Sequence, residues 1–189
     1  MKKITTILVC FVSVLASAQE IQKKDVSVEK SIFGIQTGLL GIWVHNEMRL
    51  TNEIALRTEL GLDSGIFLNS STFKFLMAPV VTLEPRWYYN LERRSSKNKS
   101  IIKNSGSFFA IKTSYNPDLF TISNADNVGV INQLLIIPKW GIKRTYFGNL
   151  TFETGAGFGE VFYFGKSAAD LSKKSEFAVD LHLRIGYTF

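Results

Sequence analysis

Hydrophobic and polar residues alternate along most of the chain, most regularly at its C-terminal end. Successive side chains of a β-strand point to opposite faces, so this alternation predicts a strand with one apolar and one polar face. At about 14 residues, the segment exceeds the roughly 9–11 that a tilted strand needs to cross a membrane. Its apolar face consists of Phe177, Val179, Leu181, Leu183, Ile185, Tyr187 and Phe189.

Five earlier segments show the same period of two, with a weaker pattern in the third: 54–63, 77–91, 106–116, 134–144 and 149–163. No helical period is found after the first residues of the chain. Pro85 and Pro138 fall inside two of these segments. Proline cannot donate a ladder hydrogen bond, so we expect a β-bulge at each.

Residues 31–50 fit either one long strand or a hairpin of 32–40 and 42–50 that turns at Gly41. Single-chain bacterial barrels usually have an even number of strands, with both termini facing the periplasm. The hairpin brings the total to eight, whereas one strand gives seven. We therefore predict an all-β fold, an antiparallel up-and-down transmembrane β-barrel of about eight strands over residues 31–189. Residues 64–76, 117–130 and 165–175 then form external loops, and 50–53, 92–104 and 145–148 form periplasmic turns.

The polar faces of the strands indicate what fills the barrel. Alternation alone also fits a soluble barrel whose apolar face points inward. The polar positions, however, carry charges of opposite sign that nearly balance, as buried charges require. The close pairs are Arg57 and Glu59, Glu84 and Arg86, and Asp180 and Arg184 with His182 between them; Glu47 and Arg49 have the same spacing, and the set is completed by Lys112, Lys139, Lys143 and Glu153. This pattern predicts an ion-paired lumen filled with side chains, without an open pore.

Two further features support this assignment of faces. Gly155, Gly157 and Gly159 lie on the polar face, where we expect them to make room for long side chains from facing strands. Aromatic residues lie on the apolar face toward strand ends, as in the interfacial girdles of membrane barrels. They are Trp87, Tyr89, Trp140, Tyr187 and Phe189.

The first 18 residues have the organisation of a cleaved signal peptide. Lys2 and Lys3 precede an apolar run at 4–15, and small residues at 16–18 form the expected cleavage site. Residues 19–30 would then be a short periplasmic segment. Cleavage removes Cys10, the single cysteine, so we expect no disulfide or thiol chemistry in the mature chain. The formal charge of +6 falls to +4 with the two lysines, too little to indicate a nucleic-acid partner.

The signal peptide, the period-two strands and the last strand ending at Phe189 together resemble the OmpA/OmpX-like class of small outer-membrane barrels of Gram-negative bacteria. The resemblance implies a monomer surrounded by outer-membrane lipids, with its last strand read by the barrel-assembly machinery. In contrast to OmpA itself, we expect no periplasmic domain here.

Candidate chemistry is sparse. His45 and His182 are the only histidines, and neither has the spacing of a nucleophile–base pair or of a metal site. We predict no catalytic, cofactor-binding or metal-binding residues, and interpret the basic run at 93–103 as a solvated turn. The sequence favours a non-enzymatic integral outer-membrane protein with a structural or surface-interaction role. The alternatives are a lipid-modifying barrel enzyme and a soluble secreted β-barrel that binds a small apolar ligand.

Overall fold

The computed structural model describes residues 26–69, 72–124, 129–164 and 174–189. The expected signal peptide, with Cys10, lies outside the described residues, as do residues 19–25 and parts of the three expected external loops.

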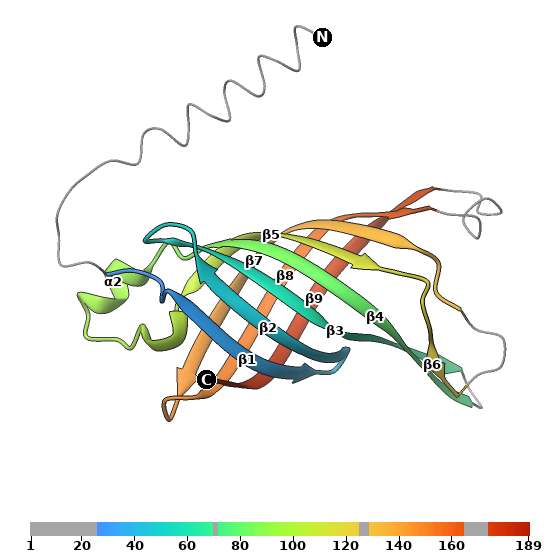
Figure 1. The fold of residues 1–189 in the computed structure, drawn as a ribbon, viewed down its shortest axis with the longest axis horizontal. Helices are drawn as coiled ribbons and strands as arrows, with labels where there is room; N and C mark the ends of the chain where they lie inside the picture. Colours follow the sequence, from blue (N-terminus) through green and yellow to red (C-terminus); the bar gives the residue numbers. More distant parts are fainter. Residues whose placement is uncertain (1–25, 70–71, 125–128, 165–173) are drawn as a thin grey trace, which may run out of the picture.

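The described chain forms a closed antiparallel barrel with up-and-down topology (Figure 1). Each strand pairs with its neighbours in the order β3-β2-β1-β9-β8-β7-β5-β4, and pairing of β3 with β4 closes the ring. The predicted all-β, antiparallel up-and-down barrel of eight strands is confirmed. The strands are β1 (Ser31–Gly38), β2 (Gly41–Arg49), β3 (Ile54–Asn69), β4 (Thr72–Trp87), β5 (Ser107–Asn116), β7 (Gln133–Tyr146), β8 (Leu150–Tyr163) and β9 (Ser175–Thr188). A short additional strand, β6 (Ile122–Ser123), pairs with β4 beyond the end of β5.

Residues 31–50 form the predicted hairpin, but the turn lies at Leu39–Leu40. Gly41 is the first residue of β2 and pairs with Gly38. Its φ of 147° is a conformation that L-residues with a side chain rarely adopt, which explains why glycine ends this turn.

The barrel wall is uneven because this hairpin is short, whereas β3 and β4 extend well into the expected external loop 64–76 (Figure 1). β1 pairs with β9 only from Arg184 to Thr188. Among the described residues, 175–183 of β9 pair with β8 alone, and β3 beyond Ser64 pairs with β4 alone. The wall therefore has a step above the tip of the β1–β2 hairpin.

The expected bulges at Pro85 and Pro138 are wrong, because the register of the described ladders is the same on both sides of each proline. Each proline only interrupts one ladder: Pro85 has no pairing partner on β5, and Pro138 has none on β8. A strand residue directs its N–H toward one neighbour, so the missing donor affects one side of the strand and leaves the other ladder intact.

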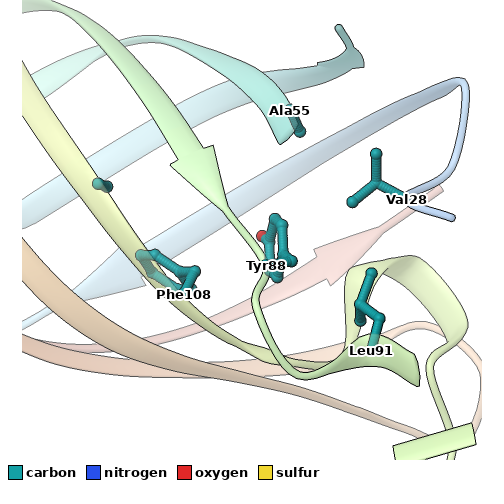
Figure 2. Close-up of a cluster of buried hydrophobic side chains, with 6 residues drawn as sticks. Val28, Ala55, Tyr88, Leu91 and Phe108 are labelled. Carbon is teal, nitrogen blue, oxygen red and sulfur yellow. The ribbon is translucent and has the colours of Figure 1, made fainter. Parts of the chain in front are cut away.

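The end of the barrel that carries the C-terminus is here called the terminal end. There the connection between β4 and β5 contains α2 (Leu91–Ser95) and a 3₁₀ turn, η1 (Ile102–Asn104), which the sequence pattern did not reveal because both are too short to show a period. Among the described residues, no helix is long and apolar enough to cross a membrane. Val28 enters this end and packs with Ala55, Tyr88, Leu91, Phe108 and Ala110 (Figure 2).

The outer surface of the barrel is apolar. The expected girdle residues all face outward, with exposed fractions between 39% at Trp140 and 61% at Phe189. Trp87 and Tyr89 form an edge contact near the terminal end, and the Trp140 indole donates to the Tyr89 hydroxyl at 2.9 Å. Other exposed apolar side chains include Phe33, Ile35, Val44, Leu83, Ile111, Phe152, Val179 and Leu183.

Candidate functional site in the lumen

The lumen contains the charged residues that the alternation placed on the polar face. They are buried although their side chains are ionisable, and every barrel strand contributes at least one buried polar side chain. The buried charged residues are Glu47, Arg57, Glu59, Glu84, Arg86, Lys112, Lys139, Lys143, Glu153 and Arg184.

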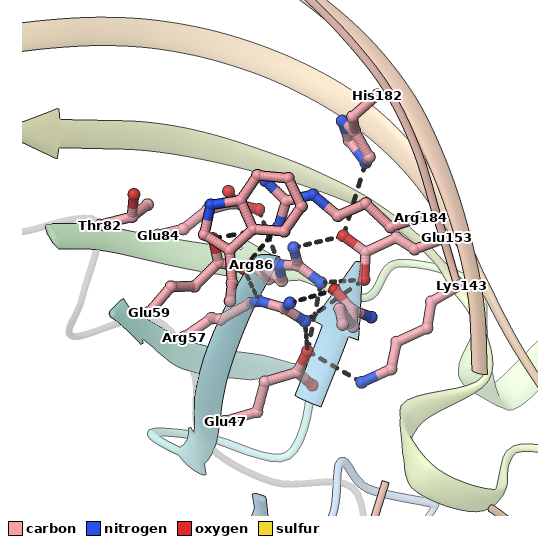
Figure 3. A network of polar contacts seen from close by, with 12 residues as sticks. Glu47, Arg57, Glu59, Thr82, Glu84, Arg86, Lys143, Glu153, His182 and Arg184 are labelled. Atoms are coloured by element: carbon pink, nitrogen blue, oxygen red, sulfur yellow. Dashed lines mark hydrogen bonds and ion pairs between the residues drawn. The ribbon is translucent and has the colours of Figure 1, made fainter. Parts of the chain in front are cut away.

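Arg57 of β3 is one of two guanidinium groups at the centre of this network (Figure 3). Its Nη1 donates to Glu47 at 3.0 Å and to Glu153 at 3.3 Å, which joins β2 to β8 across the lumen. Its Nε donates to Glu59, and its Nη2 donates to the Gln36 side-chain oxygen at 2.5 Å. Arg57 thus donates four hydrogen bonds to side chains in the lumen.

Arg86 of β4 is the second central guanidinium. Its Nη2 donates to Glu153 at 2.7 Å, its Nε to Glu84 at 2.7 Å, and its Nη1 to both Glu153 at 3.0 Å and Glu47 at 3.2 Å. Its guanidinium carbon also lies 4.2 Å from the centre of the Phe108 ring, a cation–π contact. Arg57 and Arg86 thus share Glu47 and Glu153 as common partners.

Glu47 connects this network to the terminal end. It accepts hydrogen bonds from Lys143 at 2.9 Å, from the Tyr88 hydroxyl at 3.2 Å and from the Asn104 amide at 2.9 Å. The Asn104 side-chain oxygen in turn accepts from the backbone N–H of Glu29 at 2.7 Å. No pattern in the sequence indicates a lumen role for Asn104, because it belongs to a connection without periodicity.

Two of the four expected charge pairs are confirmed, Arg57 with Glu59 and Glu84 with Arg86. The pairing of Asp180 with Arg184 is wrong: Arg184 donates to both carboxylate oxygens of Glu59, at 2.8 and 3.0 Å. Four residues along a strand span about 13 Å at about 3.3 Å each, too far for a direct contact.

Among the described residues, Glu47 does not form the expected ion pair with Arg49 and contacts Arg57, Arg86 and Lys143 instead. Arg49 is half-buried near the end of β2, and the Glu47 carboxylate is already occupied by lumen cations.

A second group of charges lies around Asp180, farther from the terminal end, and its contacts are longer. The Asp180 carboxylate is 3.4 Å from Lys112, 3.5 Å from Lys139 and 3.6 Å from His182. His182 is also 3.5 Å from Glu153 (Figure 3). Good N–H···O hydrogen bonds measure 2.7–3.2 Å. The charges around Asp180 are therefore paired more loosely than those around Arg57 and Arg86.

Both histidines face the lumen and lie against a glycine of the neighbouring strand. A Cβ at Gly155 would lie 2.5 Å from the His182 ring, and one at Gly34 would lie 2.6 Å from the His45 ring. The expectation that Gly155, Gly157 and Gly159 make room for long side chains from facing strands stays a prediction. The atoms nearest to these glycines belong to adjacent strands, including the Cβ of Lys139 beside Gly157.

The arrangement closes the barrel rather than leaving a channel. Arg57, Arg86 and Glu47 are 0% exposed, so no passage wide enough for water runs beside them. Their charges compensate one another through direct contacts, as buried ions require. In the described part of the chain, no group of histidine, cysteine, aspartate or glutamate side chains is arranged to hold a metal ion.

Comparison of the chain with protein-family models, with curated proteins and with solved structures finds no match.

Proposed function

We propose that this chain is a non-enzymatic integral protein of the bacterial outer membrane, with a structural or surface-interaction role, whose lumen is plugged by ion-paired side chains. The observation that carries the proposal is the inverted polarity of the barrel: large apolar side chains cover the outside, and the charges lie inside.

This polarity is costly in water. Removing one large apolar side chain from water is worth about 1.5–3 kcal/mol, and the outer surface exposes many of them. Soluble monomers rarely expose apolar patches larger than a few hundred Å², and larger ones mark contact with a membrane or another protein. Strands of 14 residues or more, such as β7, β8 and β9, are long enough to cross a bilayer at a tilt.

The same polarity argues against a soluble barrel that binds an apolar ligand inside. Such a protein needs an apolar cavity, whereas the centre of this lumen holds Arg57, Arg86 and their carboxylate partners. For an enzyme, a nucleophile beside a general base would be the expected sign. His182 lies instead beside the carboxylates of Glu153 and Asp180 and against Gly155. His45 lies against Gly34. These neighbours fit a structural role for both histidines.

Export, orientation and partners complete the proposal. The signal peptide would direct the chain through the inner membrane, and the barrel-assembly machinery would read the last strand, which ends at Phe189. The terminal end would face the periplasm, with Trp87, Tyr89 and Trp140 at the lipid interface. The barrel would be a monomer in contact with outer-membrane lipids, and nucleic acid would not be a partner.

Refolding into lipid vesicles tests this proposal. We expect the folded protein to float with the vesicles and to migrate differently on SDS gels before and after boiling. In variants with a single tryptophan, bromine on the acyl chains of the phospholipid should quench Trp140, which faces outward, far more than Trp43, which is 4% exposed inside the lumen. A protein that stays out of the vesicles, with equal quenching of the two tryptophans and one gel position, would contradict the proposal.

A further inference from the structure

The outer face of β7 carries a charged residue near the terminal end. Lys143 points into the lumen, so the next residue, Arg144, points outward on the same face as Trp140 and Ile142. Its side chain is half-buried. Long basic side chains near the end of a membrane-spanning segment lay their stem on apolar surface and extend the charge to the head groups. In the proposed orientation, Arg144 therefore lies at the level of the periplasmic head groups.

One edge of the Arg144 guanidinium is free to bind a ligand. Its Nη1 donates to the backbone oxygens of Gly106 at 2.7 Å and of Lys143 at 2.6 Å, which holds the group in place. Nε and Nη2 make no hydrogen bond to any described residue. Neither nitrogen is buried, so a ligand can reach both. The N–H groups of Nε and Nη2 are parallel donors of the kind with which arginine binds a carboxylate or a phosphate at two oxygens.

Arg94 places a second positive charge beside Arg144. It belongs to α2, and its Nε and Nη2 donate to the backbone oxygen of Ser100 at 3.2 and 2.8 Å. The two arginines are close enough for their like charges to interact, and the Tyr146 phenol lies near both. Among the described residues, neither forms an ion pair with a carboxylate. This part of the rim therefore carries two uncompensated positive charges, which complement an anion.

An apolar groove of about 480 Å³ adjoins Arg144 on the outer surface of the barrel. Its apolar walls come from β7, β8 and β9 and consist of Ile142, Leu150, Phe152 and Leu183. Glu153 also borders the groove, but its side chain is 0% exposed and its carboxylate binds Arg86 in the lumen. The groove therefore presents apolar side chains to the outside and a guanidinium toward its terminal end.

The turn between β7 and β8, residues 147–149, lies at the terminal end and borders the same groove (Figure 1). Phe147 lines the groove and is 96% exposed. Its φ of 51° lies in the left-handed region, where a bulky side chain is rare. Turns that lie in water normally carry glycine or short polar residues at such positions. An exposed phenylalanine here indicates that the turn contacts lipid.

We propose that the groove holds one phospholipid of net negative charge, with its phosphate on the free edge of Arg144 and an acyl chain along Phe152 and Leu183. A phosphate offers the paired oxygens that Nε and Nη2 require. The charge of Arg94 attracts an anionic head group and disfavours the cationic group of a zwitterionic one. This site rests on the proposed membrane location, because an outward groove meets an acyl chain only where lipid surrounds the barrel.

Trp140 reports on the groove because it lies on the same outer face of β7 as Ile142, two residues away. The protein with Trp43 and Trp87 replaced by phenylalanine is refolded into phosphatidylcholine vesicles that contain a small fraction of phosphatidylglycerol. In one series the phosphatidylglycerol carries bromine on its acyl chains, and in the other an equal amount of the phosphatidylcholine does. Both leaflets have the same composition, so the comparison does not depend on the orientation of the barrel.

We expect brominated phosphatidylglycerol to quench Trp140 more strongly than the same fraction of brominated phosphatidylcholine, with saturation as its fraction rises. This comparison needs no variant of the site. A basic residue near an anionic head group contributes about 1 kcal/mol, so Arg144→Gln should lower the preference at least about fivefold. Arg93→Gln removes the same charge from an exposed position on α2 and should leave the preference nearly unchanged, because salt screens an exposed charge.

Three outcomes would overturn the inference: equal quenching by the two brominated lipids, equal losses in the two glutamine variants, or loss of the difference when inorganic phosphate is added at constant ionic strength. The second would assign the preference to the diffuse charge of the rim, and the third would assign the arginines to a free anion. Flotation of the same vesicles separates this inference from the proposed function. A protein that floats without the preference contradicts only the bound lipid, whereas a protein that does not float contradicts both.

Discussion

Replacing Arg86 by alanine tests whether the lumen is held together by compensated charge. Arg86 is fully buried and donates four hydrogen bonds of 2.7–3.2 Å to three carboxylates, those of Glu47, Glu84 and Glu153. The truncation leaves Glu153 with only the long contact to Arg57 at 3.3 Å and the contact to His182. Removing one partner of a buried ion pair costs about 3–5 kcal/mol, because the other charge remains buried. We expect a loss of that size in the free energy of unfolding.

The measurement is urea unfolding of the protein in vesicles, followed by tryptophan fluorescence. Arg93→Ala is the matched control, because Arg93 is exposed on α2 and the same truncation there should change stability by less than about 0.5 kcal/mol. Adding Glu153→Gln to Arg86→Ala removes the stranded charge and should recover part of the loss. A loss below about 1 kcal/mol for Arg86→Ala, or no recovery in the double variant, would refute the reasoning and indicate a solvated lumen.

Three further outcomes follow from the structure. Gly155→Ala should lower the free energy of unfolding by about 1–3 kcal/mol, because the new Cβ would lie 2.5 Å from the His182 ring and 2.7 Å from a backbone oxygen. Gly129→Ala is the control and should be neutral, because a Cβ there would have no atom within 4 Å. Arg184→Ala should destabilise the protein because Glu59 loses both contacts to Arg184 and keeps only the buried contact to Arg57. Glu59→Gln should therefore restore part of the loss, and Asp180→Asn should not. In planar bilayers the parent should show no stepwise conductance, and regular ion steps would contradict a lumen closed by Arg57 and Arg86.

The barrel could be predicted from the sequence because a period of two is a local property. The alternation of apolar and polar residues within one strand shows which face is apolar, whatever the neighbouring strands are. The prediction fails where the two faces of a strand are alike. Residues 64–69 read Ser-Gly-Ile-Phe-Leu-Asn, with apolar residues at consecutive positions, so the sequence pattern predicts a loop where β3 in fact continues.

The partners inside the lumen could not be predicted in the same way. A pair two residues apart on one strand, such as Arg57 and Glu59, is visible in the sequence. The contact of Arg184 with Glu59 joins β9 to β3 across 125 positions of the chain, and it depends on how the strands are staggered around the ring. Nothing local in the sequence specifies that stagger.

The length of one hairpin divides the lumen into two parts with different properties. Where all eight strands complete the wall, Arg57 and Arg86 make short contacts to carboxylates and no water reaches them. Above the Leu39–Leu40 turn the wall lacks β1 and β2, and there the contacts of Asp180 lengthen to 3.4–3.6 Å. Buried polar atoms without a hydrogen-bond partner occur in both parts, among them Gln36 Nε2 of β1 and His182 Nδ1 of β9. A charged cluster is left loosely paired at a cost in stability, since each unsatisfied buried polar group costs about 1–3 kcal/mol. The short hairpin therefore separates a tightly paired centre from a loosely paired group of charges around Asp180.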